Sequence, residues 1–103
     1  MSEFVAVMDA QSLPAGRGRT VNVKGREFAI YNFEGHFYAL DDICPHRGGS
    51  LGAGLLEQGQ VYCPMHAWGF DVKTGYCSNR PDRPVKTYPT RIVEGQVEIC
   101  IDL

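Results

Sequence analysis

The sequence predicts one antiparallel all-β domain. Short runs rich in β-branched and aromatic residues alternate along the chain with turns, and Gly or Pro stands at most of their boundaries. No stretch holds a convincing helical period. The length of 103 residues, of which 44% are hydrophobic, suits a single small globular domain.

The N-terminal part contains four predicted strands. The second and third flank Lys24-Gly25, and the third and fourth flank Glu34-Gly35, which are turns of the hairpin kind. The four strands span residues 3–9, 19–23, 26–33 and 36–42.

Two further strands are predicted at the C-terminus, over residues 85–93 and 96–103, with Glu94-Gly95 between them. In the last strand Val97, Ile99 and Ile101 share one face and the polar side chains share the other. This period of two is typical of a half-buried strand.

Residues 43–84 break the strand pattern, because glycines and prolines are dense there. Such a segment buries too little apolar surface to offset the entropy lost on ordering. We therefore expect a bound metal centre to hold this part of the chain together.

Cysteine and histidine occur together twice in that segment. Cys44-x-His46 is followed, after sixteen residues, by Cys63-x-x-His66. Thiolate and imidazole ligands suit zinc or iron–sulfur chemistry. A zinc finger would set its cysteines together and its histidines together on a helix, whereas each pair here is mixed and residues 66–71 read as a strand. A structural zinc module remains an alternative at this point.

The sequences CPHRGG (44–49) and CPMHAWGFDVKTG (63–75) resemble the two cluster-binding loops of Rieske [2Fe–2S] proteins. The flanking segments 37–46 and 85–99 resemble that family's strands, and the likeness covers roughly residues 18–102.

The resemblance implies a Rieske-like antiparallel β-sandwich or barrel with a small inserted lobe. Residues 1–42 and 85–103 would form the base, and residues 43–84 would form the cluster-binding lobe, within one domain over residues 1–103.

The resemblance also implies one [2Fe–2S] cluster. Cys44 and Cys63 would bind one iron, and His46 and His66 the other. Two imidazoles in place of two thiolates remove two negative charges, so an added electron is accepted more easily than in an all-cysteine cluster.

The resemblance further indicates a low potential. Gly49 and Met65 stand at the positions of a loop-joining disulfide in high-potential members, so that bridge cannot form. Trp68 and Phe70 stand where those members carry hydroxyl groups aimed at sulfur. Hydrogen bonds to the sulfurs raise the potential, and we expect a value near the lower end of about −150 to +300 mV.

The implied function is electron transfer, with no catalytic residues. By likeness to the small ferredoxins of aromatic-ring oxygenase systems, the partners would be a flavin-containing reductase and a terminal oxygenase, meeting the tip that carries both histidine loops. The sequence also resembles the small subunit of assimilatory NAD(P)H nitrite reductase, and this alternative stays open.

Two catalytic classes are disfavoured. An oxygenase needs a second iron held by two histidines and a carboxylate, and only His36 remains once His46 and His66 are used. A Cys–His hydrolase needs one dyad, whereas two matched pairs indicate shared metal ligation. Cys77 and Cys100 have no histidine nearby and are interpreted as ordinary, partly buried residues.

Charge and hydropathy set the remaining expectations. A net charge of −2 does not suit a nucleic-acid-binding domain. No apolar run approaches the roughly 20 residues of a membrane helix, and no secretory signal is apparent. We expect a cytoplasmic protein that is monomeric when free.

Overall fold

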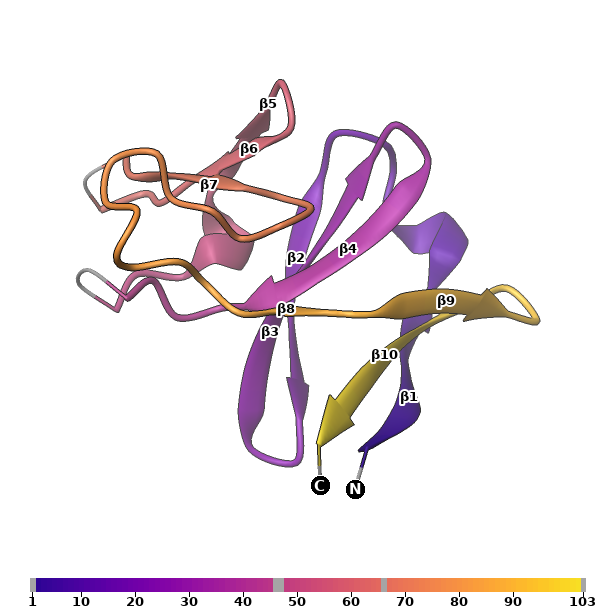
Figure 1. Ribbon diagram of the computed structural model, residues 1–103. Helices are drawn as coiled ribbons and strands as arrows, with labels where there is room; N and C mark the ends of the chain where they lie inside the picture. The colour runs from indigo at the N-terminus through magenta and orange to yellow at the C-terminus, as the bar shows by residue number, and fades with distance from the viewer. Residues whose placement is uncertain (1, 46–47, 66, 103) are drawn as a thin grey trace.

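The computed structural model describes residues 2–45, 48–65 and 67–102, and Figure 1 shows their arrangement. Within these residues the chain forms antiparallel strands and two short 3₁₀ helices. The elements are β1 (Ser2–Asp9), η1 (Ala10–Ser12), β2 (Gly18–Val23), β3 (Arg26–Phe33), β4 (His36–Asp41), η2 (Leu51–Ala53), β5 (Leu55–Glu57), β6 (Gln60–Tyr62), β7 (Gly69–Asp71), β8 (Thr87–Tyr88), β9 (Thr90–Val93) and β10 (Gln96–Asp102). The predicted all-β class is confirmed.

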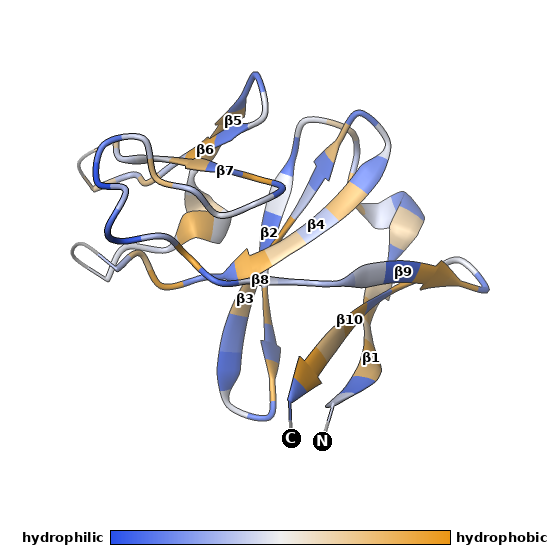
Figure 2. Ribbon diagram, viewed as in Figure 1, coloured by the Kyte–Doolittle hydropathy of each residue, from blue (hydrophilic) through white to orange (hydrophobic). Residues whose placement is uncertain are grey.

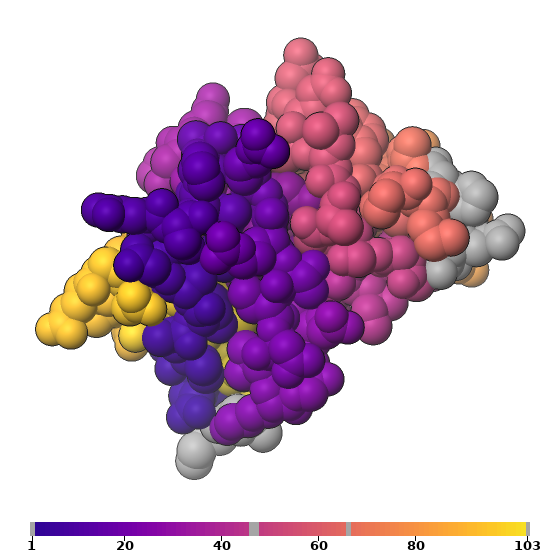
Figure 3. Space-filling view, turned by 180° about the vertical axis from the view of Figure 1, so that it is seen from behind, coloured from indigo at the N-terminus to yellow at the C-terminus, as the bar shows by residue number. Residues whose placement is uncertain are grey.

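The strands form three antiparallel sheets. Their orders are β1-β10-β9, β2-β3-β4-β8 and β5-β6-β7. The view from behind in Figure 3 places residues of β5–β7 on one side of the molecule and the β9–β10 hairpin on the opposite side. No helix in the described part of the chain is long and apolar enough to cross a membrane.

Four hairpins turn through the same kind of dipeptide. Each has a residue with positive φ followed by a glycine with positive φ, which is the pattern of type I′ turns. The four dipeptides are Lys24-Gly25, Glu34-Gly35, Gln58-Gly59 and Glu94-Gly95. The first, second and fourth were predicted, and the third joins β5 to β6.

Strand β3 is buried on both of its faces. Phe28 and Ile30 pack into a core with the inner residues of β10, whereas Ala29 and Tyr31 pack into a second core with residues of the β5–β7 sheet. This explains why residues 28–31 form a continuous apolar run rather than a clean alternation. The β2-β3-β4-β8 sheet is thus the central layer of the fold.

The last strand has the predicted alternation. Val97, Ile99 and Ile101 are all buried in the first core, and Glu98, Cys100 and Asp102 are more exposed. Figure 2 shows the exposed end of β9, with Ile92 and Val93, as a further apolar segment of this hairpin.

Two predictions need correction. The single strand expected over residues 85–93 is divided at Pro89 into β8, which pairs with β4, and β9, which pairs with β10. Proline has no N–H to continue a ladder, so the chain passes from one sheet to the other there. In addition, residues 43–84 hold a regular sheet, β5-β6-β7, of which only the strand character of 66–71 was expected.

Candidate metal centre

The first cysteine loop leaves β4 and is closed by two backbone hydrogen bonds. The Cys44 N–H donates to Gly49 O at 2.8 Å, and the Gly48 N–H donates to Cys44 O at 2.9 Å. Gly48 has a φ of +74°, a conformation that glycine adopts without strain. The loop therefore returns to its starting point, where Ile43 and Ser50 form a β-bridge.

The second cysteine loop closes in the same way between β6 and β7. The Cys63 N–H donates to Trp68 O at 2.9 Å, and the Ala67 N–H donates to Cys63 O at 2.9 Å. Ala67 has a φ of +56°, so it occupies the left-handed region at the position that Gly48 holds in the first loop. The two loops are equivalent in backbone closure although their sequences differ.

The two loops bring Cys44 and Cys63 together. Both side chains belong to the second core, with exposures of 1% and 3%, and each thiol is in the electrostatic neighbourhood of the other. Burial raises the pKa of the Cys63 thiol, the Met65 backbone N–H acts in the opposite direction, and the Cys44 thiol raises the pKa further. Two buried thiols in one core are a donor set for a thiophilic metal, which would take the place of their protons.

Gly49 leaves space for these groups because it has no side chain. A Cβ atom built on Gly49 would lie 2.9 Å from Met65 Cγ and 3.0 Å from Cys63 Sγ. The structure thus places Gly49 against Met65, the two positions interpreted as those of the absent loop-joining disulfide. All four cysteines are free thiols.

A third loop, residues 78–84, packs beside the second cysteine loop. Asn79 Oδ1 accepts a hydrogen bond from the Gly69 N–H at 2.9 Å, and the Arg80 guanidinium lies 6.0 Å from the centre of the Trp68 ring. Arg80 also forms a two-point ion pair with Asp82, and this pairing lowers the pKa of the Asp82 carboxyl. The structure therefore adds a third segment to the two that the sequence motif identifies.

Of the four predicted ligands, the structure describes Cys44 and Cys63 and brings them together. His46 and His66 lie outside the described residues. Among the described residues no group of three or more His, Cys, Asp or Glu side chains is assembled for a metal ion. Cys100 is partly buried on β10, as predicted, whereas Cys77 is fully buried in the same core, with a bridge to Phe70, and not partly buried as predicted.

Sequence reasoning did not find a structural role for Asp42 or for Asn79. Both side chains hold loop segments by hydrogen bonds, and Asp42 is buried beside the first cysteine loop. The signal that could have identified Asp42 is its position two residues before Cys44, next to the end of a strand.

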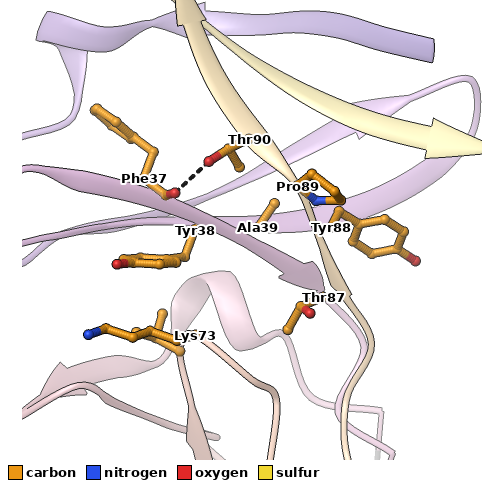
Figure 4. A pocket seen from close by; sticks show the side chains of 9 residues that line it. Phe37, Tyr38, Ala39, Lys73, Thr87, Tyr88, Pro89 and Thr90 are labelled. Atoms are coloured by element: carbon orange, nitrogen blue, oxygen red, sulfur yellow. Dashed lines mark hydrogen bonds between the residues drawn. The ribbon is translucent and has the colours of Figure 1, made fainter. Parts of the chain in front are cut away.

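One hollow of the surface lies away from the thiols. It has a volume of 480 Å³ and lies between β4, Val72-Lys73 and the segment 87–90, where Thr90 Oγ1 donates to Phe37 O at 2.6 Å (Figure 4). Neither Cys44 nor Cys63 lines it. The hollow is therefore separate from the candidate centre.

Comparison with known proteins assigns the chain to a family. Residues 3–89 match the model of the Rieske [2Fe–2S] domain. The ferredoxin component of a naphthalene 1,2-dioxygenase system of Pseudomonas aeruginosa is 41% identical over 102 residues, covering 98% of this chain and 96% of that protein.

Solved structures agree with this assignment. A chain in the complex of reduced oxygenase and oxidised ferredoxin of carbazole 1,9a-dioxygenase superposes with a TM-score of 0.86 at 32% identity, over 93% of this chain and 91% of that one. A nitrite reductase small subunit from Mycobacterium tuberculosis superposes with a TM-score of 0.90 at 22% identity, over 100% and 98% of the two chains, and shows the shared fold.

A Rieske domain implies one [2Fe–2S] cluster, and the donor chemistry of the buried Cys44–Cys63 pair suits it. The match spans far more than half of the chain, and the fold is the same. The chain therefore belongs to the Rieske [2Fe–2S] domain family.

Proposed function

We propose that this chain is a low-potential Rieske ferredoxin that carries one electron from a flavin-containing reductase to a terminal oxygenase. The observation that carries the proposal is the pair of buried thiols that two loops of equivalent closure bring into the same core. Relatives that match nearly the whole chain, such as the one in the naphthalene dioxygenase system, are ferredoxin components rather than catalytic subunits.

In the proposed centre Cys44 and Cys63 hold one iron, and His46 and His66 hold the other. When bound, the [2Fe–2S] cluster supplies reversible one-electron chemistry. The thiolate pair sits on the buried side, since Cys44 and Cys63 are enclosed by the second core. In this proposal electrons enter and leave the centre on the side of the iron that His46 and His66 hold.

The surrounding residues keep the site rigid and dry. Pro45 and Pro64 each follow a ligand cysteine and restrict φ at the start of its loop. Phe70, with no exposed surface, and half-buried Trp68 belong to the core that surrounds the thiols. A stiff site of this kind changes little in geometry between its two oxidation states.

The domain division stays part of this proposal: residues 1–42 and 85–103 form a base, and residues 43–84 form the lobe that holds the cluster. The separate β5-β6-β7 sheet, which lies entirely within the lobe's span, supports it. Partners would meet the lobe at the histidine loops, and the free protein would be a monomer. Four free cysteines suit a cytoplasmic location.

The nitrite reductase alternative is secondary. The nitrite reductase small subunits that superpose on this chain are 22% identical and show only the fold. A structural zinc site is disfavoured, because the family implies an iron–sulfur cluster.

The direct test is the iron and acid-labile sulfide content of protein purified without oxygen. We expect two irons and two sulfides per chain. Cys63→Ser should abolish the sulfide, whereas Cys77→Ala, which changes a buried thiol of the same core, should retain it. Wild-type protein without labile sulfide would refute the cluster assignment.

The partners are tested by reconstitution. The protein should couple NADH oxidation by the flavin-containing reductase of a ring-hydroxylating system to turnover by the matching oxygenase. His66→Cys should lower the midpoint potential, because a thiolate adds negative charge to the centre. An unchanged midpoint in that variant would show that His66 is not a ligand.

A further inference from the structure

Asp42 is a buried carboxylate at the start of the first cysteine loop, two residues before Cys44. Its exposure is 3%, and it stands between the end of β4 and Cys44. A charged side chain at such a place requires several polar partners, because burial removes its hydration. The proposed electron transfer assigns no role to Asp42.

Three donors converge on a single oxygen of this carboxylate. Asp42 Oδ1 accepts from the Gly52 N–H at 2.7 Å and from two hydroxyls, Thr20 Oγ1 at 2.9 Å and Ser50 Oγ at 3.0 Å. Thr20 belongs to β2, whereas Ser50 and Gly52 belong to the returning end of the cysteine loop. The carboxylate therefore joins the loop to a strand of the central sheet.

The backbone of the same residue adds to this attachment. Asp42 O accepts from the Leu51 N–H at 2.6 Å, and the Asp42 N–H donates to Glu27 O at 3.2 Å. The Tyr31 hydroxyl donates to Leu51 O from β3. The cysteine loop thus leaves the sheet immediately after Asp42 and returns to Asp42 at residues 50–52.

There is no room for a side chain at Gly52, where the cysteine loop meets Asp42 and β2. A Cβ atom on Gly52 would lie 2.8 Å from Asp42 Oδ1 and 2.9 Å from the Thr20 backbone nitrogen. Only glycine lets the loop backbone approach the carboxylate and β2 this closely. The arrangement leaves the loop little freedom to shift relative to the sheet.

We propose that Asp42 is a positioning residue for the iron–sulfur centre, which fixes the first cysteine loop against β2 and places a buried negative charge behind Cys44. This inference rests on the proposed role of Cys44 as a ligand. Because a buried charge is poorly screened, it opposes the arrival of an electron and lowers the midpoint potential. Asp42 therefore acts on the centre through both geometry and charge.

The two contributions can be separated by substitution. Asp42→Asn keeps an acceptor oxygen for all three donors but removes the charge, so the cluster should be retained and the midpoint should rise. Asp42→Ala removes the acceptor and should lose iron and sulfide several-fold faster than wild type. A role in folding alone would not raise the midpoint of a variant that keeps its cluster.

Thr20→Val provides a second, independent test from another strand. It removes one donor to the carboxylate, together with the contact between Thr20 Oγ1 and Ser50 Oγ at 3.1 Å, and leaves the residues of β4 and of the cysteine loop unchanged. Because the negative charge is then less compensated, the midpoint should fall, opposite in sign to the change in Asp42→Asn. This variant decides the question if Asp42→Asn does not fold.

Asn32→Ala is the matched control. Asn32 is also a buried polar residue that holds loops, since Nδ2 donates to Leu13 O at 2.8 Å and Oδ1 accepts from the Gly35 N–H at 3.0 Å, but its partners are remote from the cysteine loops. It should lower the melting temperature and leave the midpoint unchanged.

The experiment compares iron, labile sulfide and midpoint potential in the holoprotein and these variants. The proposal is overturned if a cluster-loaded Asp42→Asn protein keeps the wild-type midpoint, if Thr20→Val leaves the midpoint unchanged or raises it, or if Asp42→Ala retains its cluster as wild type does. These failures differ from failure of the proposed function, in which the wild-type protein itself would hold no labile sulfide.

Discussion

Gly48 and Ala67 occupy equivalent positions in the two cysteine loops, each donating its N–H to the carbonyl of the cysteine that opens its loop. Both have positive φ, +74° and +56°, but only one is glycine. The left-handed conformation at this position is therefore unstrained in the first loop and strained in the second.

Exchanging the residue types at these two positions should change stability in opposite directions. Gly48→Ala has open space for its Cβ atom, so its cost is the left-handed conformation, about 1 kcal/mol. Ala67→Gly removes the strain of the left-handed conformation, which stabilises the folded state. Glycine also increases the entropy of the unfolded chain, which acts in the opposite direction, so we expect a net stabilisation of at most about 1 kcal/mol. Denaturant unfolding under anaerobic conditions measures both, and a destabilised Ala67→Gly protein would contradict the comparison.

Gly49→Ala should impair cluster retention. The added methyl would lie 3.0 Å from Cys63 Sγ, and in the proposed centre that atom could not move away because it would bind iron. We expect faster loss of visible absorbance in air than for the wild type. Gly48→Ala, at the neighbouring position with open space, is the control and should lose its cluster at a rate near that of wild type.

Stability should fall at high pH because of two buried phenols. Burial, followed by the charge of Asp42, raises the pKa of Tyr31 to about 12, while burial, followed by the hydrogen bond to Asp41, raises that of Tyr88 to about 12. The folded state thus favours the neutral phenols. Their contribution is complete below pH 10 and is lost as the pH rises through 12.

For Tyr31, which is 1% exposed, the loss corresponds to about 3 kcal/mol in the free energy of unfolding. Spectrophotometric titration of tyrosinate measures the effect, and Tyr31→Phe and Tyr88→Phe should each remove one ionisation above pH 11. If either substitution leaves the titration above pH 11 intact, the assignment for that residue is wrong.

The midpoint potential should be about −150 mV. Phe70, which has no hydroxyl, is fully buried in the core that holds both thiols, so Phe70→Tyr should raise the potential by adding a donor near sulfur. Phe28→Tyr makes the same change in the other core and should not shift the potential. A clearly positive wild-type midpoint would contradict this expectation.

The sequence predicted the strands wherever burial or turn chemistry left a local signal. Strand β3 was predicted at its observed bounds because two X-Gly turns delimit it. The alternation in β10 identified its buried face correctly.

The β5-β6-β7 sheet could not be predicted in the same way. Each of its strands has three residues, too few to show a period, and glycines surround them. It forms because Val61 and Phe70 pack into the core on the outer face of β3. Tertiary packing therefore decides this sheet, not local propensity.

The candidate site was predictable in part. The cysteines identified the two loops because thiols beside imidazoles have few other uses, and the structure brings Cys44 and Cys63 together. Asp42 was missed because its donors come from positions as distant as Thr20. Contacts of that kind are a property of the folded chain and leave no spacing pattern.

The burial of β3 between two cores has a consequence for how the molecule melts. Ile30 and Tyr31 are adjacent in the chain, yet each supports a different core. Loss of packing in the core that contains Cys44 and Cys63 should therefore also destabilise the other core, because β3 contributes side chains to both. Amide hydrogens of β3 should be the slowest to exchange with deuterium, and stripping the iron should accelerate exchange throughout the chain, including in β10.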